Sequence, residues 1–168
     1  MGRTLDAGNT PGLSYNLAVD LQQIVSGFRR LSPSDFDLNN VNSDGIERLR
    51  ELADAVQRLP APEAAIPEMF GLMERMPDVE LGSPGPLVHT LEAIPGYKSH
   101  LANSVRRQPS LLSVWMVNRI LNSPVPEKRR DFWMTLLQES ADRLDSPEPV
   151  RQDACDFIAL QKKRQNDH

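Results

Sequence analysis

Apolar residues recur at intervals of three and four along most of this chain, the spacing that places side chains on one face of an α-helix. The first such run covers residues 17–31, and Ser14 is a suitable N-cap for it. A second run covers residues 46–59, with Ser43 as its candidate N-cap. The inward positions are Leu17, Leu21, Ile24, Val25, Phe28 and Leu31 in the first helix and Ile46, Leu49, Leu52, Ala53, Val56 and Leu59 in the second.

Turn-forming residues separate the helical runs. The segment Ser32–Asn42 is rich in Pro, Asn, Asp and Ser and predicts an ordered loop held by the apolar residues Phe36 and Leu38. A third helix is expected from Pro62, where the missing backbone N–H does no harm, to about Met76. Pro67 inside this run predicts a kink or a split.

The middle of the chain predicts three short helices between proline-marked turns. Ser83 is expected to cap a helix that ends near Ile94, and Tyr97–Gln108 forms the next one. Ser110 then caps Leu111–Leu121, which is apolar nearly all round and should lie in the middle of the fold. Its polar residues are Ser113, Asn118 and Arg119.

Two longer helices complete the chain, at about Pro126–Leu144 and Pro147–Lys163. No strand-like alternation exceeds four residues, and the short connections favour antiparallel neighbours. We therefore expect an all-α fold of seven or eight helices in stacked antiparallel hairpins, either an irregular α-solenoid or a compact helical bundle. Residues 1–168 form a single domain, with 1–13 a flexible N-terminal segment and 164–168 a frayed C-terminus. The inward positions are Phe132, Trp133, Leu136, Leu137 and Leu144, then Val150, Ala154, Phe157, Ile158 and Leu160.

The charge of the chain is unevenly distributed. Residues 1–84 carry 7 basic and 13 acidic side chains, whereas residues 85–168 carry 12 and 10. An acidic half suits a basic protein partner and is a poor match for nucleic acid. One cysteine, no membrane-spanning run and a polar start without a secretion signal together predict a cytoplasmic protein that does not bind membranes.

No residue pattern predicts catalysis, a metal site or a cofactor. Cys155 is followed by a carboxylate, whose negative charge disfavours the reactive thiolate, so we expect an inert, partly buried thiol. His89 and Glu92 have metal-ligand spacing but no third ligand, and the segment Gly82–Pro86 offers few N–H groups to a phosphate. The carboxylate pairs at 47 and 51, 142 and 145, and 153 and 156 are typical of solvated helix faces. The sequence predicts that the protein is not an enzyme.

The chain has four basic clusters, one of them Lys128–Arg130, and the other three have a structural explanation. Arg29-Arg30, Arg106-Arg107 and Lys162–Arg164 end predicted helices, where the helix dipole favours positive charge. Trp115 and Trp133 are expected in the core. Asn118 and Arg119 either satisfy carbonyls of neighbouring helices or reach a concave surface.

The segment Leu81–Asn122 resembles a type of helical immunity protein encoded beside bacterial polymorphic toxins. The resemblance rests on the SPGPLVHTLE turn and helix, the GYKSHLANSVRRQPS hairpin and the WMVNRILN helix. It implies an all-helical antitoxin without enzyme activity that acts in interbacterial competition. Such a protein binds its cognate toxin, one to one, in the cytoplasm and blocks the toxin's active site.

Inhibitors of toxins that act on nucleic acids commonly present carboxylates to a basic cleft, so we expect the binding surface in the acidic N-terminal half. One alternative is a helical scaffold or adaptor that binds a peptide or protein in a groove. Another is a nucleotide-handling or nucleic-acid-associated enzyme whose site assembles from residues that the sequence alone does not pair. The candidate partner-binding residues are Asp35, Asp37, Asp44, Glu47, Glu68, Asp78 and Glu80.

Overall fold

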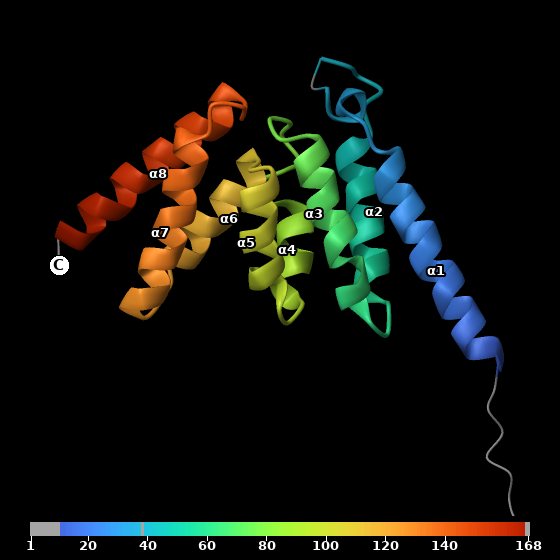
Figure 1. The fold of residues 1–168 in the computed structure, drawn as a ribbon. Helices are drawn as coiled ribbons and strands as arrows, with labels where there is room; N and C mark the ends of the chain where they lie inside the picture. The colour runs from blue at the N-terminus through green and yellow to red at the C-terminus, as the bar shows by residue number, and fades with distance from the viewer. Residues whose placement is uncertain (1–10, 38, 167–168) are drawn as a thin grey trace, which may run out of the picture.

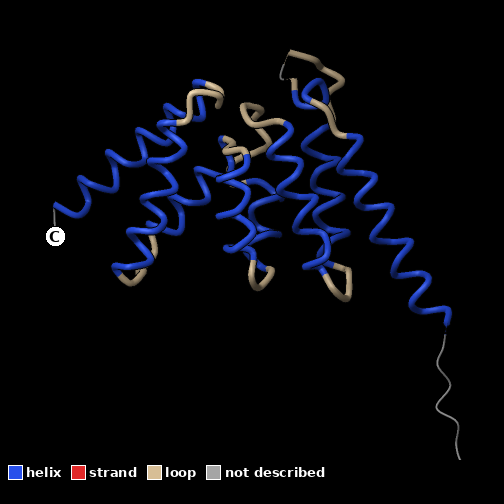
Figure 2. The backbone as a smooth tube through the Cα atoms, in the orientation of Figure 1, coloured by secondary structure: helices blue, strands red, loops and turns tan. Residues whose placement is uncertain are grey.

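The structure is a computed structural model that describes residues 11–37 and 39–166, with no side chains described for residues 11–19. This part of the chain contains eight α-helices, two 3₁₀-helices and no strand (Figures 1 and 2). The predicted all-α class is therefore confirmed. The helices are α1 (Pro11–Arg30), η1 (Pro33–Phe36), α2 (Gly45–Gln57), η2 (Pro62–Ala65), α3 (Ile66–Arg75), α4 (Gly85–Ala93), α5 (Tyr97–Arg107), α6 (Leu111–Leu121), α7 (Glu127–Asp142) and α8 (Glu148–Asn166).

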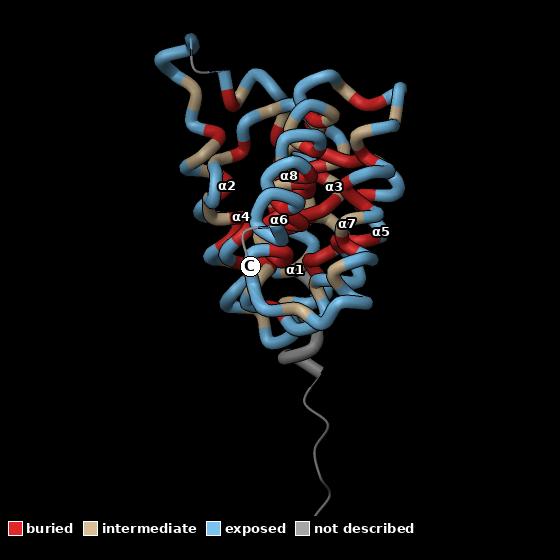
Figure 3. Tube along the Cα trace, turned by 90° about the vertical axis from the view of Figure 1, so that its left-hand side faces the viewer, coloured by how far each residue is buried: buried red, intermediate tan, exposed pale blue. Residues whose placement is uncertain are grey.

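The helices stack in two layers. In the odd layer, α1 packs on α3, α3 on α5 and α5 on α7, while the even layer contains α2 packed on α4 and α6 packed on α8. Figure 3 shows α2 and α4 on one side and α3, α5 and α7 on the other. This is the arrangement of an irregular α-solenoid built from hairpins.

The connections fall on two opposite edges of the stack. Each odd helix is joined to the following even helix at the upper edge of Figure 1, through residues 31–44, 76–84, 108–110 and 143–147. The connections from even to odd helices, residues 58–65, 94–96 and 122–126, lie at the lower edge. Helices within one layer therefore run in the same direction.

The central helix α6 is the most buried of the stack, as its apolar sequence predicts. Eight of its residues are buried, among them Val114, Met116 and Val117. Its start is fixed by a reciprocal pair of bonds, because Ser113 N donates to Ser110 Oγ at 3.1 Å and Ser110 N donates to Ser113 Oγ at 2.8 Å. The predicted capping by Ser110 is confirmed.

Side-chain polar contacts join neighbouring helices within each layer. At most of these junctions the side chain that accepts the hydrogen bond is buried or half-buried. The contacts therefore help to set the alignment of neighbouring hairpins. In the odd layer the pairs are Arg29–Glu68, Arg107–Glu74 and Arg106–Glu139, and in the even layer Gln57–Thr90, Arg119–Glu92 and Gln161–Asn118.

Several expected helix starts differ from the structure. Helix α1 begins at Pro11, so Ser14 does not cap it and residues 11–13 are helical. The N-cap residues of α2 and α4 are Asp44 and Pro84 rather than Ser43 and Ser83, and neither makes a side-chain capping bond. Pro67 does split its run, since η2 gives way to α3 one residue before it. Residues 1–10, Leu38, Asp167 and His168 lie outside the described residues, and the side chain of Leu17 is not described.

Some inward assignments were wrong for the last two helices. Leu144 is exposed because α7 ends at Asp142, two residues before the expected end. Phe132 and Leu160 are exposed because the buried faces pass through Trp133 and Gln161 instead. Cys155, expected to be partly buried, is also exposed.

The structure agrees more closely with the expected burial of the aromatic residues Phe36, Trp115 and Trp133. Phe36 and Trp133 are buried as expected, whereas Trp115 is only half-buried. No described helix combines the length and the apolar character needed to cross a membrane.

Candidate functional site

The candidate site begins where the chain between α1 and α2 closes onto the first turn of α2. Asp35 in η1 accepts hydrogen bonds from the backbone N–H and the hydroxyl of Ser32 at 2.8 and 2.9 Å. Arg48 of α2 donates to the same carboxylate at 2.8 Å. The backbone N–H of Ser32 is the main reason why the pKa of Asp35 lies below its ordinary value, with the Ser32 hydroxyl and Arg48 acting in the same direction against burial.

Asp35 therefore holds the loop rather than presenting a free charge. Its side chain is only 22% exposed, and three donors already occupy its oxygens. The positive charge of Arg48 also reaches Asp44 at 3.6 Å. Of the predicted binding residues, Asp35 thus has a positioning role in the described structure.

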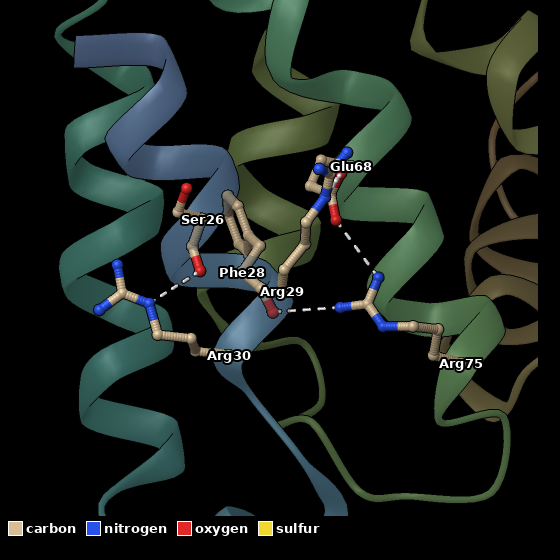
Figure 4. Close-up of polar contacts among 6 residues, drawn as sticks. All are labelled: Ser26, Phe28, Arg29, Arg30, Glu68 and Arg75. Carbon is tan, nitrogen blue, oxygen red and sulfur yellow. Dashed lines mark hydrogen bonds and ion pairs between the residues drawn. The ribbon is translucent and has the colours of Figure 1, made fainter. Parts of the chain in front are cut away.

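Glu68 is likewise engaged inside the fold. Its side chain is 13% exposed, and its two oxygens pair with Arg29 of α1 at 3.1 Å and with Arg75 of α3 at 3.2 Å. Arg75 also donates to the carbonyl oxygen of Phe28 at 3.1 Å, which closes the C-terminal end of α1 (Figure 4). Glu68 joins α1 to α3 and is not grouped with the other predicted residues.

The other predicted carboxylates are exposed near the upper edge. Asp37 accepts from the backbone N–H of Asn39 at 2.9 Å, and Glu47 pairs with Arg50 at 3.5 Å on the solvent face of α2. Asp78 and Glu80 lie in the connection from α3 to α4, where Glu80 accepts from the backbone N–H of Gly82 at 3.1 Å.

The α3–α4 connection packs against the start of α2. A methyl group placed at Gly82 would lie 3.6 Å from the Ile46 side chain, so the backbone near Glu80 lies close to the first turn of α2. This contact brings Glu80 and Glu47 to the same edge although they come from different hairpins.

The structure adds two carboxylates that sequence reasoning assigned to a solvated helix face. Asp153 and Asp156 lie in the N-terminal half of α8. Burial raises the pKa of Asp153 above its ordinary value, and the negative charges of Asp156 and Glu80 raise it further. Glu80 is thus close enough to α8 to affect it, a proximity that no local sequence pattern signals.

These residues form a surface that we call the acidic edge. Its members come from the α1–α2 connection, the first turn of α2, the α3–α4 connection and α8. Most are exposed, and the helices that carry them belong to the packed stack. The acidic edge comprises Asp37, Asp44, Glu47, Asp78, Glu80, Asp153 and Asp156.

The other candidate positions show no assembled chemistry. Glu92 binds Arg119 through both oxygens at 2.8 Å, and His89 is exposed on α4. Asn118 and Arg119 were expected either to bind carbonyl groups of neighbouring helices or to reach a concave surface. They do bind neighbouring helices, but their partners are the side chains of Gln161 and Glu92. Within residues 11–37 and 39–166, no three His, Cys, Asp or Glu side chains are close enough to hold a metal ion.

The fold and the acidic edge define the class of this protein: an all-helical stack of hairpins with a carboxylate-rich edge drawn from separate segments. Comparison with family models, curated proteins and solved structures gives no match for this chain.

Proposed function

We propose that this chain is an immunity protein that binds a cognate bacterial toxin in the cytoplasm and occludes the toxin's active site. In this proposal the protein is not an enzyme, uses no cofactor, and forms a 1:1 complex. The observation that carries the proposal is the acidic edge, to which three hairpins of the packed stack contribute carboxylates. The resemblance of Leu81–Asn122 to helical immunity proteins supports the same function.

The acidic edge suits a partner with a basic cleft. Toxins that cut or modify nucleic acids need positive charge around the substrate phosphates, and a carboxylate surface is complementary to it. Complementary charge accelerates encounter and excludes wrong partners more than it adds affinity. Speed is what an inhibitor needs when it must capture a toxin before the toxin acts.

The proposal assigns different roles to the seven predicted binding residues. Asp37, Asp44, Glu47, Asp78 and Glu80 contact the toxin directly. Asp35 and Glu68 hold the α1–α2 loop and the α1–α3 junction, because their oxygens are already bound by internal donors. Asp153 extends the contact surface onto α8.

Co-expression with the product of the adjacent gene tests this function. We expect that product to stop growth when expressed alone, that this chain restores growth, and that the two proteins purify as a 1:1 complex. An adjacent product that is not toxic, or whose toxicity persists, would contradict the proposal and leave the adaptor alternative. Mass photometry or light scattering of the purified complex gives the stoichiometry.

A further inference from the structure

Three adjoining hollows surround the C-terminal end of α6. This end of α6 lies near the lower edge in Figure 1. One of ≈ 440 Å³ lies between α4, α5 and α6, and shares Lys98 and Ile120 with a second of ≈ 290 Å³ between α5 and α7. The third, of ≈ 540 Å³, lies between α6, α7 and α8 and shares Asn122 with the first. The hollows therefore form one continuous surface, on the edge of the stack opposite the acidic edge.

Positive charge dominates this surface. Its only carboxylate among the described residues is Glu92, whose two oxygens are already bound by Arg119 at 2.8 Å. Within the described part of the chain, Lys98 and Arg129 have no carboxylate within ion-pair distance. We call Lys98, Arg119, Arg129, Arg130, Phe132 and Arg164 the cationic surface.

Among the residues that the structure describes, two arginines of the cationic surface have only neutral oxygens as partners. Arg130 donates to the Leu121 carbonyl at 3.1 Å and to the Gln161 side-chain oxygen at 2.8 Å, and its Nε is buried without a partner. Arg164 donates to the side-chain oxygen of Asn122. Neutral acceptors do not compensate the charge of a guanidinium group, so a carboxylate brought to Arg130 or Arg164 would form a stronger, charge-assisted bond than these acceptors do.

The hollow between α5 and α7 adds an apolar element. Its lining includes Ala102, Ile120, Val125 and Phe132, and the Phe132 side chain is exposed. Trp133 meets Phe132 edge-on with ring centroids 5.1 Å apart, and the Arg106 guanidinium lies 5.3 Å from the Phe132 centroid. An exposed aromatic ring beside an apolar hollow, with cations on its rim, is a common arrangement for anchoring a bulky side chain of a protein partner.

We infer that the cationic surface docks an acidic peptide segment that carries one aromatic or large aliphatic side chain. The apolar side chain enters the hollow beside Phe132, and flanking Asp or Glu residues face Lys98, Arg129, Arg130 and Arg164. A nucleic acid fits less well for two reasons. Arg106 and Trp133 already contact the Phe132 ring and leave less of it for base stacking. The net charge of −4 also repels a long polyanion. A short acidic segment meets only the local positive field. This inference does not depend on the proposed toxin.

Selection of a random 12-residue phage-displayed peptide library on the full chain tests the inference. We expect enriched sequences in which Asp or Glu flanks Phe, Trp or Leu, and a synthetic copy that binds at 150 mM salt by fluorescence anisotropy. Arg129→Glu and Phe132→Ala should each weaken this binding at least tenfold. Lys128→Glu, the same charge change at an adjacent exposed position outside the three hollows, should change it less than twofold.

Two kinds of result would overturn the inference. The first is a selection that yields no peptides, yields peptides without acidic residues, or yields peptides whose binding Arg129→Glu leaves unchanged. The second is tighter binding of a 12-nucleotide single-stranded DNA than of the selected peptide, with the same loss in Arg129→Glu. Circular dichroism melting of each variant establishes that a lost signal reflects the surface and not the fold.

Discussion

Gly45 is the first residue of α2 and contacts the α1–α2 connection. At the residue scale, this contact explains why the connection can pack closely against α2. A methyl group at this position would lie 2.4 Å from the Asp35 carbonyl oxygen and 2.9 Å from the Phe36 ring. Backbone cannot move away as a flexible side chain can, so only glycine fits without displacing η1. The same loop carries Asp37 and Asp44, two members of the acidic edge.

Gly45→Ala should therefore lower the free energy of unfolding by about 1–3 kcal/mol, the usual cost of overpacking. Gly71→Ala is the matched control, because its nearest neighbour is the Arg75 side chain at 3.7 Å and it lies inside α3. We expect that change to stabilise the protein by about 0.5–1 kcal/mol. Urea unfolding monitored by circular dichroism measures both, and equal effects of the two substitutions would refute the packing argument.

Asp153 provides a pH-dependent prediction. Its pKa is raised in the folded state by burial and by the charges of Asp156 and Glu80, so its ionised form destabilises the fold at neutral pH. The penalty disappears as pH falls through the folded pKa to below the unfolded value of about 3.9. Asp153→Asn should therefore raise the free energy of unfolding at pH 7 and leave it unchanged near pH 3. A stability gain that persists at pH 3, or a loss at pH 7, would be inconsistent with this assignment.

The roles of individual carboxylates were not predictable from the sequence. Glu47 and Glu68 look alike in the sequence, yet one is exposed on α2 and the other joins α1 to α3. Asp153 was assigned to a solvated face because local spacing says nothing about Glu80, which comes from another hairpin. The role of each of these carboxylates depends on which residues from other helices lie beside it. The helical spacing of apolar residues gives no information about such neighbours.

At the scale of elements, prolines made the helices predictable, whereas of the four serines expected as N-caps only Ser110 caps its helix. Ser110 starts α6, Pro67 lies where η2 changes to α3, and Pro109 and Pro124 separate α5, α6 and α7. The errors concern the starts of α1, α2 and α4, the end of α7, and helix faces on which a polar residue takes the place of an apolar one. Gln161 occupies the buried face of α8, and Leu160 beside it is exposed.

Gln161 joins α8 to α6 and α7 and should be important for their packing. It is 1% exposed, donates to Asn118 and Asn122 at 2.7 Å and accepts from Arg130 at 2.8 Å. Gln161→Leu leaves the buried Asn118 oxygen and Arg130 without these partners, and we expect a loss of about 1–3 kcal/mol in the free energy of unfolding.

Gln165→Leu is the control for this loss, being the same substitution one turn later at an exposed position of α8. It should remain within about 0.5 kcal/mol of the wild type in urea unfolding. If the two variants were equally stable, the polar network between α6 and α8 would not contribute to the stack.

At the scale of the whole molecule, the two-layer stack places the acidic edge and the cationic surface at opposite edges, which the division of charge between sequence halves does not indicate. The connections of one edge carry most of the acidic edge, while the cationic surface surrounds the C-terminal end of α6 near the other. The sequence predicts an all-α fold and an acidic N-terminal half, but Asp153 and Asp156 come from the C-terminal half. Which carboxylates share an edge follows from the alternation of the helices between layers.

We propose capture of a basic toxin by the acidic edge. It is tested most directly by the association rate of this chain with the toxic product of the adjacent gene, measured by stopped flow at 50 and 300 mM salt. We expect Asp44→Lys combined with Glu47→Lys and Glu80→Lys to lower the rate at least tenfold at low salt and to flatten its salt dependence. The control is Asp131→Lys, because Asp131 is exposed near the start of α7. The start of α7 lies at the opposite edge in Figure 1, so this change should leave the rate within twofold. An unchanged rate and salt dependence in the triple variant would contradict the account.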